Sequence, residues 1–361
     1  MCASASSASL IRREAGPNGV TGTAPRVRER ERAMDDPHAA AALLTAFRAG
    51  DPRALARAIS RCESGRGAGL IHALYPLTGR AVTVGLTGPP GVGKSTLSSA
   101  LVAHVRKLGK TVGVISVDPS SPFSHGALLG DRIRLAEHFV DPDVFIRSMA
   151  SRGHLGGLAG ATADAVSLMD AFGKDVVLVE TVGVGQSEIE IAEVADTTLV
   201  ALQPGSGDSV QVLKAGVLEI ADVFVVNKSD HPMALQLQRE IRSMMEMLVY
   251  DAWVPELVST QALQGKGIDK LWDAIVAHDA WLRESGAIRA KRRAAFAHRV
   301  RQLALGTLDA RIESVVAELG DDLDPYAAAE IVLERFGVRD GVGALGNVRA
   351  PGAVRAHVKG L

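Results

Sequence analysis

The chain has little cysteine, few aromatic residues, almost no net charge and no long apolar run. Its 361 residues include only Cys2 and Cys62, so neither a disulfide framework nor a cysteine-based metal site can be built within one chain. A net charge of −1 gives no bulk attraction for nucleic acid or for an anionic membrane. No uncharged apolar run reaches the roughly 18 residues that a membrane span needs. We therefore expect a globular protein of the reducing cytoplasm that binds no nucleic acid.

The composition changes along the chain and suggests four regions. Residues 1–33 are rich in Ser and Ala and then in Arg and Glu, so they cannot form a core. We expect them to be disordered, or to precede a true start at Met34. The predicted regions are the extension 1–33, a helical segment 34–77 with two short helices, a nucleotide-binding domain 78–283, and a helical segment 284–361 with a flexible tail.

A phosphate-binding loop follows the first apolar run, at residues 81–86, and precedes a helix-like run at 97–108. Residues 88–95 satisfy the pattern G-x-x-x-x-G-K-[ST], in which glycines let successive N–H groups point at a phosphate. Two prolines stiffen the entry, while Lys94 adds a charge for the β- and γ-phosphates and the hydroxyl of Ser95 suits Mg²⁺. The loop comprises Gly88, Pro89, Pro90, Gly91, Val92, Gly93, Lys94, Ser95 and Thr96.

Further β-branched, apolar runs alternate with segments long enough for helices. These runs lie at residues 111–117, 144–146, 176–179, 197–202, 223–226 and 257–258. Such alternation predicts an α/β fold with a doubly wound, mostly parallel sheet. Ligands of these sheets bind beyond the carboxyl ends of the strands. The polar residues that close runs, Asp118, Glu180 and Asn227, are therefore the first candidates for the site.

Three carboxylates are candidates for the metal and for the attacking water. Glu180 ends an apolar run, and its length favours a water-mediated contact with Mg²⁺. Gly183, three residues later, can approach the γ-phosphate because it has no side chain. Asp118 and Asp131 are close enough along the chain to contact the metal or orient water, but Asp before Pro and Asp after Gly are also ordinary turn residues. Spacing alone does not decide between them.

Residues 227–230 match the tetrad N-K-x-D, with Asn227, Lys228 and Asp230 in the defining positions. A carboxylate at Asp230 accepts hydrogen bonds from N1–H and the exocyclic amine of guanine, whereas adenine presents a lone pair at N1. A site built for such bonds rejects the wrong base by ~10⁴ or more. The tetrad therefore predicts guanine nucleotides, GTP and GDP.

Together these motifs resemble the MeaB/ArgK family of GTPases. The resemblance extends from about residue 35 to about residue 337, and its segments are residues 88–96, 117–121, 129–131, 179–188, 204–208 and 227–230. It implies a dimerising, metallochaperone-like P-loop GTPase that gates adenosylcobalamin loading and protects or reactivates methylmalonyl-CoA mutase. The implied partners are that mutase, the cobalamin adenosyltransferase and a second copy of the chain.

The resemblance also assigns roles to residues. It implies Lys94 and Ser95 at the phosphates and Mg²⁺, with Asp118, Asp131 and Glu180 as the acidic set around the metal. Residues 204–214 are implied to form a mobile loop that senses the mutase, with Lys214 as its terminal charge.

A second base-binding loop is implied at residues 260–267, where Gln261 stands in place of the family's usual Ser. The N–H of Ala262, which is followed by Leu263, is implied to donate to guanine O6. We expect the change at Gln261 to weaken the order of the loop without removing its specificity.

The C-terminal part changes character after residue 283. Apolar residues at near-helical spacing predict an amphipathic helix of about 30 residues from Ala287, and Asp324 with Pro325 predicts the start of another helix. The apolar face of the long helix needs a partner. The resemblance implies a second subunit, and the alternative is packing against its own domain.

Two other functions fit parts of the sequence. A GTPase that inserts nickel into an enzyme belongs to the same branch but generally carries Cys/His clusters, and titration with Ni²⁺ distinguishes it. An ATP-dependent kinase linked to amino-acid transport is suggested by the historical name of ArgK. It requires ATP to compete with GTP, and the tetrad at residues 227–230 argues against that.

Asp230→Asn tests whether this residue reads the base. The amide replaces the acceptor for guanine N1–H and pairs better with xanthine, so we expect weaker GTP binding and retained XTP binding. Competition of XTP and GTP for the variant measures both. A variant that still prefers GTP would show that another residue selects the base.

Overall fold

The computed structural model describes residues 37–119, 135–151, 157–181, 190–206, 217–248, 250, 252–320 and 323–338. The chain divides into two units, the first ending at Arg57 and the second beginning at Ala58. The two helices predicted near the start are present as α2 (Pro37–Arg48) and α3 (Pro52–Glu63). Two further helices, α4 (Ala68–Leu74) and the short η1 (Tyr75–Leu77), were not expected from the sequence.

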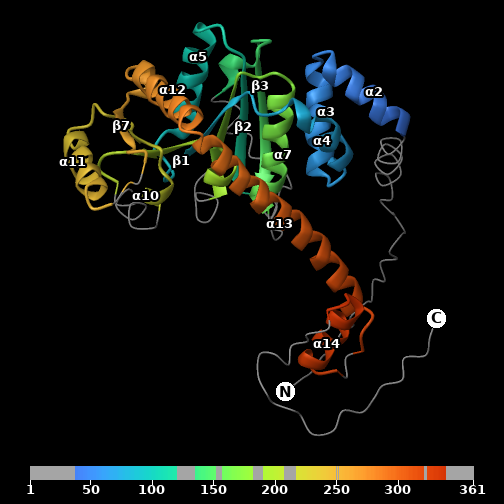
Figure 1. Ribbon diagram of the computed structural model, residues 1–361. Helices are drawn as coiled ribbons and strands as arrows, with labels where there is room; N and C mark the ends of the chain where they lie inside the picture. The colour runs from blue at the N-terminus through green and yellow to red at the C-terminus, as the bar shows by residue number, and fades with distance from the viewer. Residues whose placement is uncertain are drawn as a thin grey trace, which may run out of the picture. The chain divides into compact units, whose positions relative to one another are not determined.

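A parallel sheet forms the centre of the second unit (Figure 1). In the described part of the chain it has seven strands in the order β3-β2-β4-β1-β5-β6-β7. The predicted α/β fold with a doubly wound, parallel sheet is confirmed. The strands are β1 (Val82–Thr87), β2 (Val112–Pro119), β3 (Val144–Ser151), β4 (Val176–Thr181), β5 (Thr197–Leu202), β6 (Val223–Val226) and β7 (Glu256–Ser259).

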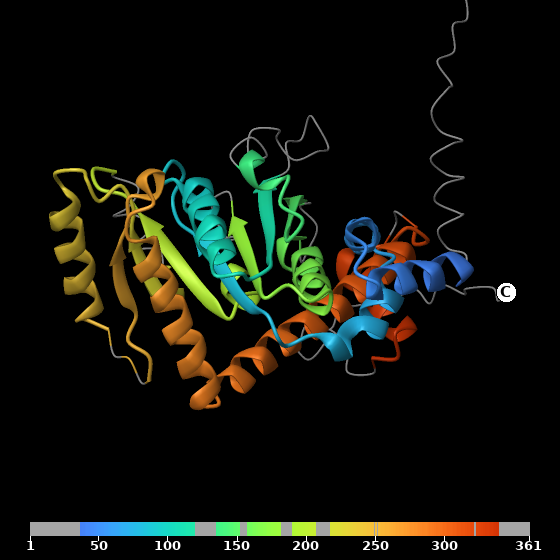
Figure 2. The same cartoon turned by 90° about the horizontal axis from the view of Figure 1, so that it is seen from above.

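Both faces of the sheet are apolar and carry helices, because alternate residues of each strand point to opposite faces. In β5, Leu199 and Ala201 pack with α5 (Lys94–Lys107) and α12 (Ile268–Glu284), which run side by side in Figure 2. The next residues of β5, Val200 and Leu202, belong to the core that includes α11 (Ala234–Met245). The same face carries α7 (Gly157–Ala171) and η3 (Ile191–Glu193).

Short elements complete the second unit, together with two C-terminal helices. The short elements are η2 (Ala136–His138), α10 (Val217–Ile220) and η4 (Ala262–Gln264), and the C-terminal helices are α13 (Ala287–Val316) and α14 (Pro325–Arg335). The long helix from Ala287 is therefore confirmed. Asp324 caps α14, as predicted, by accepting hydrogen bonds from the N–H groups of Tyr326 and Ala327 at 3.0 and 3.1 Å.

Ion pairs fix the first half of α13 to the sheet domain. Arg292 forms a two-pronged pair with Asp196, with nitrogen–oxygen distances of 3.1 and 2.7 Å, and Lys291 lies 3.0 Å from a carboxylate oxygen of Asp222. Arg299, about two turns further along, donates to both oxygens of Asp164. Such forked pairs combine charge with defined geometry. The start of α13 is therefore held by its own domain, which is the alternative that the sequence left open for this part.

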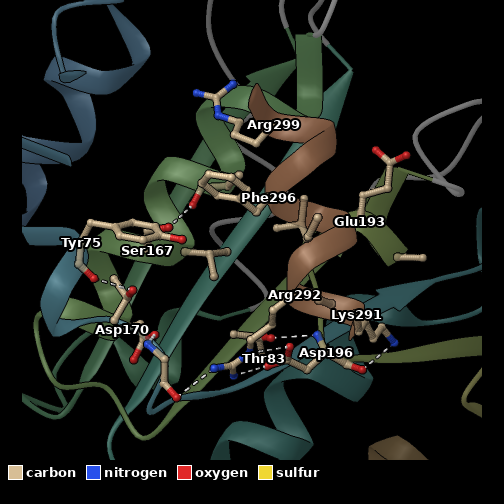
Figure 3. Close-up of a pocket in the computed structure, with 18 residues that line it drawn as sticks. Tyr75, Thr83, Ser167, Asp170, Glu193, Asp196, Lys291, Arg292, Phe296 and Arg299 are labelled. Carbon is tan, nitrogen blue, oxygen red and sulfur yellow. Dashed lines mark hydrogen bonds and ion pairs between the residues drawn. The ribbon is translucent and has the colours of Figure 1, made fainter. Parts of the chain in front are cut away.

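A pocket of about 210 Å³ lies beneath this first half of α13 (Figure 3). Thr83 near the start of β1 and Asp196 just before β5 place it at the amino ends of the strands. Ligands of parallel sheets bind at the opposite, carboxyl ends. Because Asp196 and Arg292 in its wall neutralise each other, we assign the pocket to the anchoring of α13 and not to the nucleotide.

Asp170, near the end of α7, fixes the chain as it enters β1. Its carboxylate accepts hydrogen bonds from three successive N–H groups, those of Gly79, Arg80 (3.1 Å) and Ala81 (2.9 Å), and the side chain is buried. Removing a buried acceptor leaves its donors unpaired.

Replacing this carboxylate should destabilise the domain. We expect Asp170→Ala to lower the free energy of unfolding by about 3 kcal/mol, and Asp170→Asn to lower it less because one oxygen still accepts. Urea denaturation of both variants and of the unchanged protein measures the difference. A loss below about 1 kcal/mol in Asp170→Ala would contradict this role.

Candidate functional site

The predicted phosphate loop lies between the end of β1 and the start of α5, at the carboxyl edge of the sheet. Two of its glycines have backbone angles and surroundings that no other residue fits. Gly88 has φ 137°, and a Cβ there would lie 2.1 Å from the carbonyl oxygen of Ala201. Gly93 has φ 91°, and a Cβ there would lie 2.9 Å from Nδ2 of Asn227. The loop therefore packs directly against the ends of the neighbouring strands.

Lys94 is the first residue of α5, and its side chain is buried. Its ammonium group folds back over the loop and donates hydrogen bonds to the carbonyl oxygens of Gly88 (2.5 Å) and Pro89 (3.1 Å). The positive charge is thereby held at the helix N-terminus, where the backbone already favours an anion. A phosphate bound in the loop would lie beside this charge.

Ser95 and Glu180 are brought together although 85 positions separate them. The hydroxyl of Ser95 donates to Oε1 of Glu180 at 2.6 Å, and the hydroxyl of Ser98, one turn along α5, donates to Oε2 at 2.9 Å. Glu180 is 3% exposed, so both oxygens of a buried carboxylate are bound by hydroxyl donors. The register of β4 beside β1, which pairs Glu180 with Leu86, places the carboxylate next to the phosphate loop.

The structure places the other acidic candidates less completely. Asp118 is the next-to-last residue of β2, which lies beside β4, so its backbone is at the same edge as Glu180. Asp131, Gly183 and Lys214 lie outside the described residues. Their predicted roles stay predictions.

Asn227 connects the phosphate loop to residues 260–267, the predicted second base-binding loop. Its Nδ2 donates to the carbonyl oxygen of Val92 at 2.9 Å, and its Oδ1 accepts from the hydroxyl of Thr260 (3.1 Å) and the N–H of Ala262 (3.2 Å). The side chain is 3% exposed. Its three hydrogen bonds therefore fix the spacing between the two loops.

Lys228 lies across the mouth of the phosphate loop. It has φ 55°, unusual for a residue other than glycine, and its ammonium group donates to the carbonyl of Gly91 (2.9 Å) and to Oε1 of Gln203 (2.6 Å). Asp230, two residues on, is exposed, and its predicted contact with the base stays a prediction.

The predicted second base-binding loop, residues 260–267, is closed by its backbone. The N–H of Gln261 donates to the carbonyl of Lys266 at 3.0 Å, and the N–H of Lys266 donates back at 3.3 Å. These are main-chain bonds, so the side chain of Gln261 takes no part in them, and its predicted effect on the order of the loop stays a prediction. The N–H of Ala262, implied as the donor to guanine O6, bonds Asn227 in this structure, and Leu263 is exposed.

Three residues of this arrangement were not singled out from the sequence. Ser98 is three positions after Ser95, so helical spacing alone puts both on one face of α5. Gln203 follows β5 directly and belongs to the polar residues that close strands. Thr260 follows β7 in the same way, so the strand-end rule, applied to every strand, would have found both.

Residues 55–317 match the family model described as methylmalonyl-CoA mutase-associated GTPase MeaB. The chain belongs to the MeaB family. Its site is therefore that of a P-loop GTPase, and the resemblance drawn from the motifs is confirmed.

Individual members and relatives agree with the family assignment. The chain is 45% identical over 314 residues to "Putative GTPase PH0274" of Pyrococcus horikoshii, which covers 81% of this chain and 97% of that protein. It is 39% identical over 222 residues to the mouse protein "Methylmalonic aciduria type A homolog, mitochondrial", covering 60% and 53%. The crystal structure of an LAO/AO transport system kinase superposes with a TM-score of 0.60 at 28% identity, covering 84% of this chain and 99% of that one.

The donor set at the phosphate loop of this MeaB-family protein fits Mg²⁺. Ser95 and Glu180 offer hard oxygen atoms, and Mg²⁺ takes few protein ligands because phosphates and waters supply the rest. Among the described residues, no group of three or more His, Cys, Asp or Glu side chains could hold a metal ion.

Burial raises the pKa of the Cys62 thiol to about 12, so this thiol stays protonated at neutral pH. No helix in the described part is long and apolar enough to cross a membrane.

Asn227→Ala tests the connection between the two loops. The variant leaves the carbonyl of Val92 and the N–H of Ala262 without this partner, so we expect GTP and GDP affinity to fall together by about 10- to 100-fold. Preference for guanine over xanthine should persist because Asp230 is unchanged. Fluorescent-nucleotide titration measures both quantities, and unaltered affinity would show that the loops hold their spacing without Asn227.

Proposed function

We propose that this MeaB-family GTPase is a chaperone of adenosylcobalamin-dependent methylmalonyl-CoA mutase, using GTP to gate cofactor loading and to protect or reactivate the mutase. The observation that carries the nucleotide part is the Asn227 bridge, which joins a phosphate loop to the guanine tetrad in one site. The mutase part is supported by the family that the chain matches, whose description names association with that enzyme. A cytoplasmic location remains a prediction from the sequence.

The chemistry needs no covalent step on the protein. The loop amides and Lys94 stabilise negative charge on the phosphoryl oxygens, which is the main source of catalysis in phosphoryl transfer. Ser95 and Glu180 would hold Mg²⁺, and the bound ion would supply positive charge to stabilise the phosphates. Asp118 or Asp131 is proposed to orient the attacking water. Intrinsic turnover should be slow, because the sequence offers no evident arginine finger.

A second copy of the chain is the proposed partner of α13. None of the helix's described residues is buried, although it is 30 residues long. Its second half exposes apolar side chains that include Leu303, Leu308, Ile312 and Val316. Because an amphipathic helix of this length needs a cover for its apolar face, we propose that this half forms the homodimer interface while the first half stays anchored.

The kinase remains a second candidate because of one relative, the LAO/AO transport system kinase of similar structure. A kinase would transfer phosphate from ATP, so excess ATP should compete with labelled GTP. The exposed carboxylate of Asp230 is suited to guanine and repels adenine N1. We expect no competition by ATP at concentrations where GTP competes fully.

Stimulation of hydrolysis by the mutase tests the proposed coupling. GTP turnover should be faster with adenosylcobalamin-dependent mutase than without it, and equal rates would contradict the chaperone role.

Lys214→Ala should leave GTP affinity and basal turnover within a few-fold of the unchanged protein, because Lys94 and Mg²⁺ neutralise the charge of the ground state. Stimulated turnover should fall ~10-fold or more, the scale of a charged contact made mainly in the transition state.

A surface lysine outside the predicted sensing loop at residues 204–214 provides the control. Lys107, exposed at the end of α5, should be replaceable by Ala without loss of stimulation. If Lys214→Ala also keeps full stimulation, Lys214 only solvates its own segment, and the loop senses the mutase by other residues or not at all.

A further inference from the structure

Ser98 is a buried hydroxyl for which the phosphate-loop pattern gives no role. It is 1% exposed and lies one turn into α5, behind the residues that face the phosphates. The hydroxyl of a serine inside a helix commonly donates a hydrogen bond to the carbonyl oxygen of the residue four positions earlier. Here the hydroxyl instead donates to Oε2 of Glu180 at 2.9 Å.

The bond matters because the other carboxylate oxygen of Glu180 binds Ser95, the predicted Mg²⁺ ligand. Oε1 accepts the proton of Ser95 at 2.6 Å. A serine hydroxyl has one proton and two lone pairs, so a proton committed to Glu180 leaves the lone pairs of Ser95 for a cation. The carboxylate therefore sets the direction in which Ser95 presents its lone pairs.

Glu180 needs a second constraint to hold that direction. Glutamate has one more rotatable bond than aspartate, the residue usual at this position, and ordering its side chain costs more entropy. The bond to Ser95 constrains one of its two oxygens. Ser95 and Ser98 are three residues apart on one face of α5, so together they bind both oxygens and fix the carboxylate plane.

We propose that Ser98 is a positioning residue for Mg²⁺: it holds Glu180 so that Ser95 is oriented toward the cation of the Mg²⁺–nucleotide complex. This inference rests on the proposed function, since it requires a metal at Ser95. Partners that orient metal ligands in this way typically change metal affinity by about 10- to 100-fold when removed.

The neighbouring Ser99 offers a matched control. It is also buried on α5, but its hydroxyl pairs with Glu137 and with Nε2 of His138 (3.0 Å), not with Glu180. Ser99→Ala therefore removes an equally small, buried hydroxyl from the same helix without touching the proposed metal site. Ser98→Thr retains a hydroxyl at the position under test.

The experiment measures two free Mg²⁺ concentrations. The first is the concentration at which Mg²⁺ slows the dissociation of a fluorescent GDP by half of its maximal effect. The second is the concentration at which GTP hydrolysis reaches half of its maximal rate. In Ser98→Ala we expect both concentrations to rise about 10-fold, and saturating Mg²⁺ to restore hydrolysis to within about threefold. GDP affinity in EDTA should stay within about twofold in Ser98→Ala and Ser99→Ala, and Ser98→Thr should need little more Mg²⁺ than the unchanged protein.

Several results would overturn the proposal. The proposal is wrong if Ser98→Ala needs no more Mg²⁺ than the unchanged protein. It is also wrong if Ser98→Ala weakens GDP binding by the same factor with and without Mg²⁺, because the hydroxyl would then have only a structural role. If Ser98→Ala does not fold, Ser98→Cys, with a weaker donor, is measured in its place and should raise the Mg²⁺ requirement in the same direction.

A double-mutant cycle adds a check that does not depend on absolute rates. In a Glu180→Asp background the shorter carboxylate does not reach both serines, so adding Ser98→Ala should change the Mg²⁺ requirement by less than about twofold. An undiminished effect of Ser98→Ala in that background contradicts the proposed route through Glu180. If the unchanged protein itself shows no Mg²⁺ dependence, the metal role in the proposed function fails, which is distinct from a failure of Ser98 alone.

Discussion

The whole site depends on the parallel alignment of β1 with β4 and of β5 with β6. Because the strands are parallel, their carboxyl ends meet at one edge, which brings together the phosphate loop after β1, Glu180 at the end of β4 and the tetrad after β6. The pairing of Leu86 with Glu180 is decisive, since a slip of one residue would turn the carboxylate to the other face of the sheet. Burial of both faces in apolar helices makes such a slip costly.

Polar side chains at this edge also brace one another. Asn227 holds the phosphate loop to the predicted second base-binding loop, and Lys228 links the phosphate loop to Gln203 at the end of β5. Each bond joins segments far apart in the sequence, so the loops at this edge hold one another in place.

The strand β5 connects the anchor of α13 with the nucleotide site. Asp196, just before it, pairs with Arg292 of α13, and Gln203, just after it, bonds Lys228 above the phosphate loop. The anchoring of α13 and the nucleotide site therefore lie at opposite ends of one buried strand.

The sequence by itself determined the strands, the phosphate loop, the tetrad and the long helix, because each depends on residues that are neighbours along the chain. Apolar periodicity and the steric needs of glycine are local properties, so all seven runs became strands of the sheet. Only the tertiary structure decided that Glu180 binds Ser95 and Ser98, that Lys228 reaches Gln203, and that Arg292 anchors α13. These contacts join residues 25 to 96 positions apart, and such pairs meet only once the register of the strands and the packing of the helices on the sheet are set.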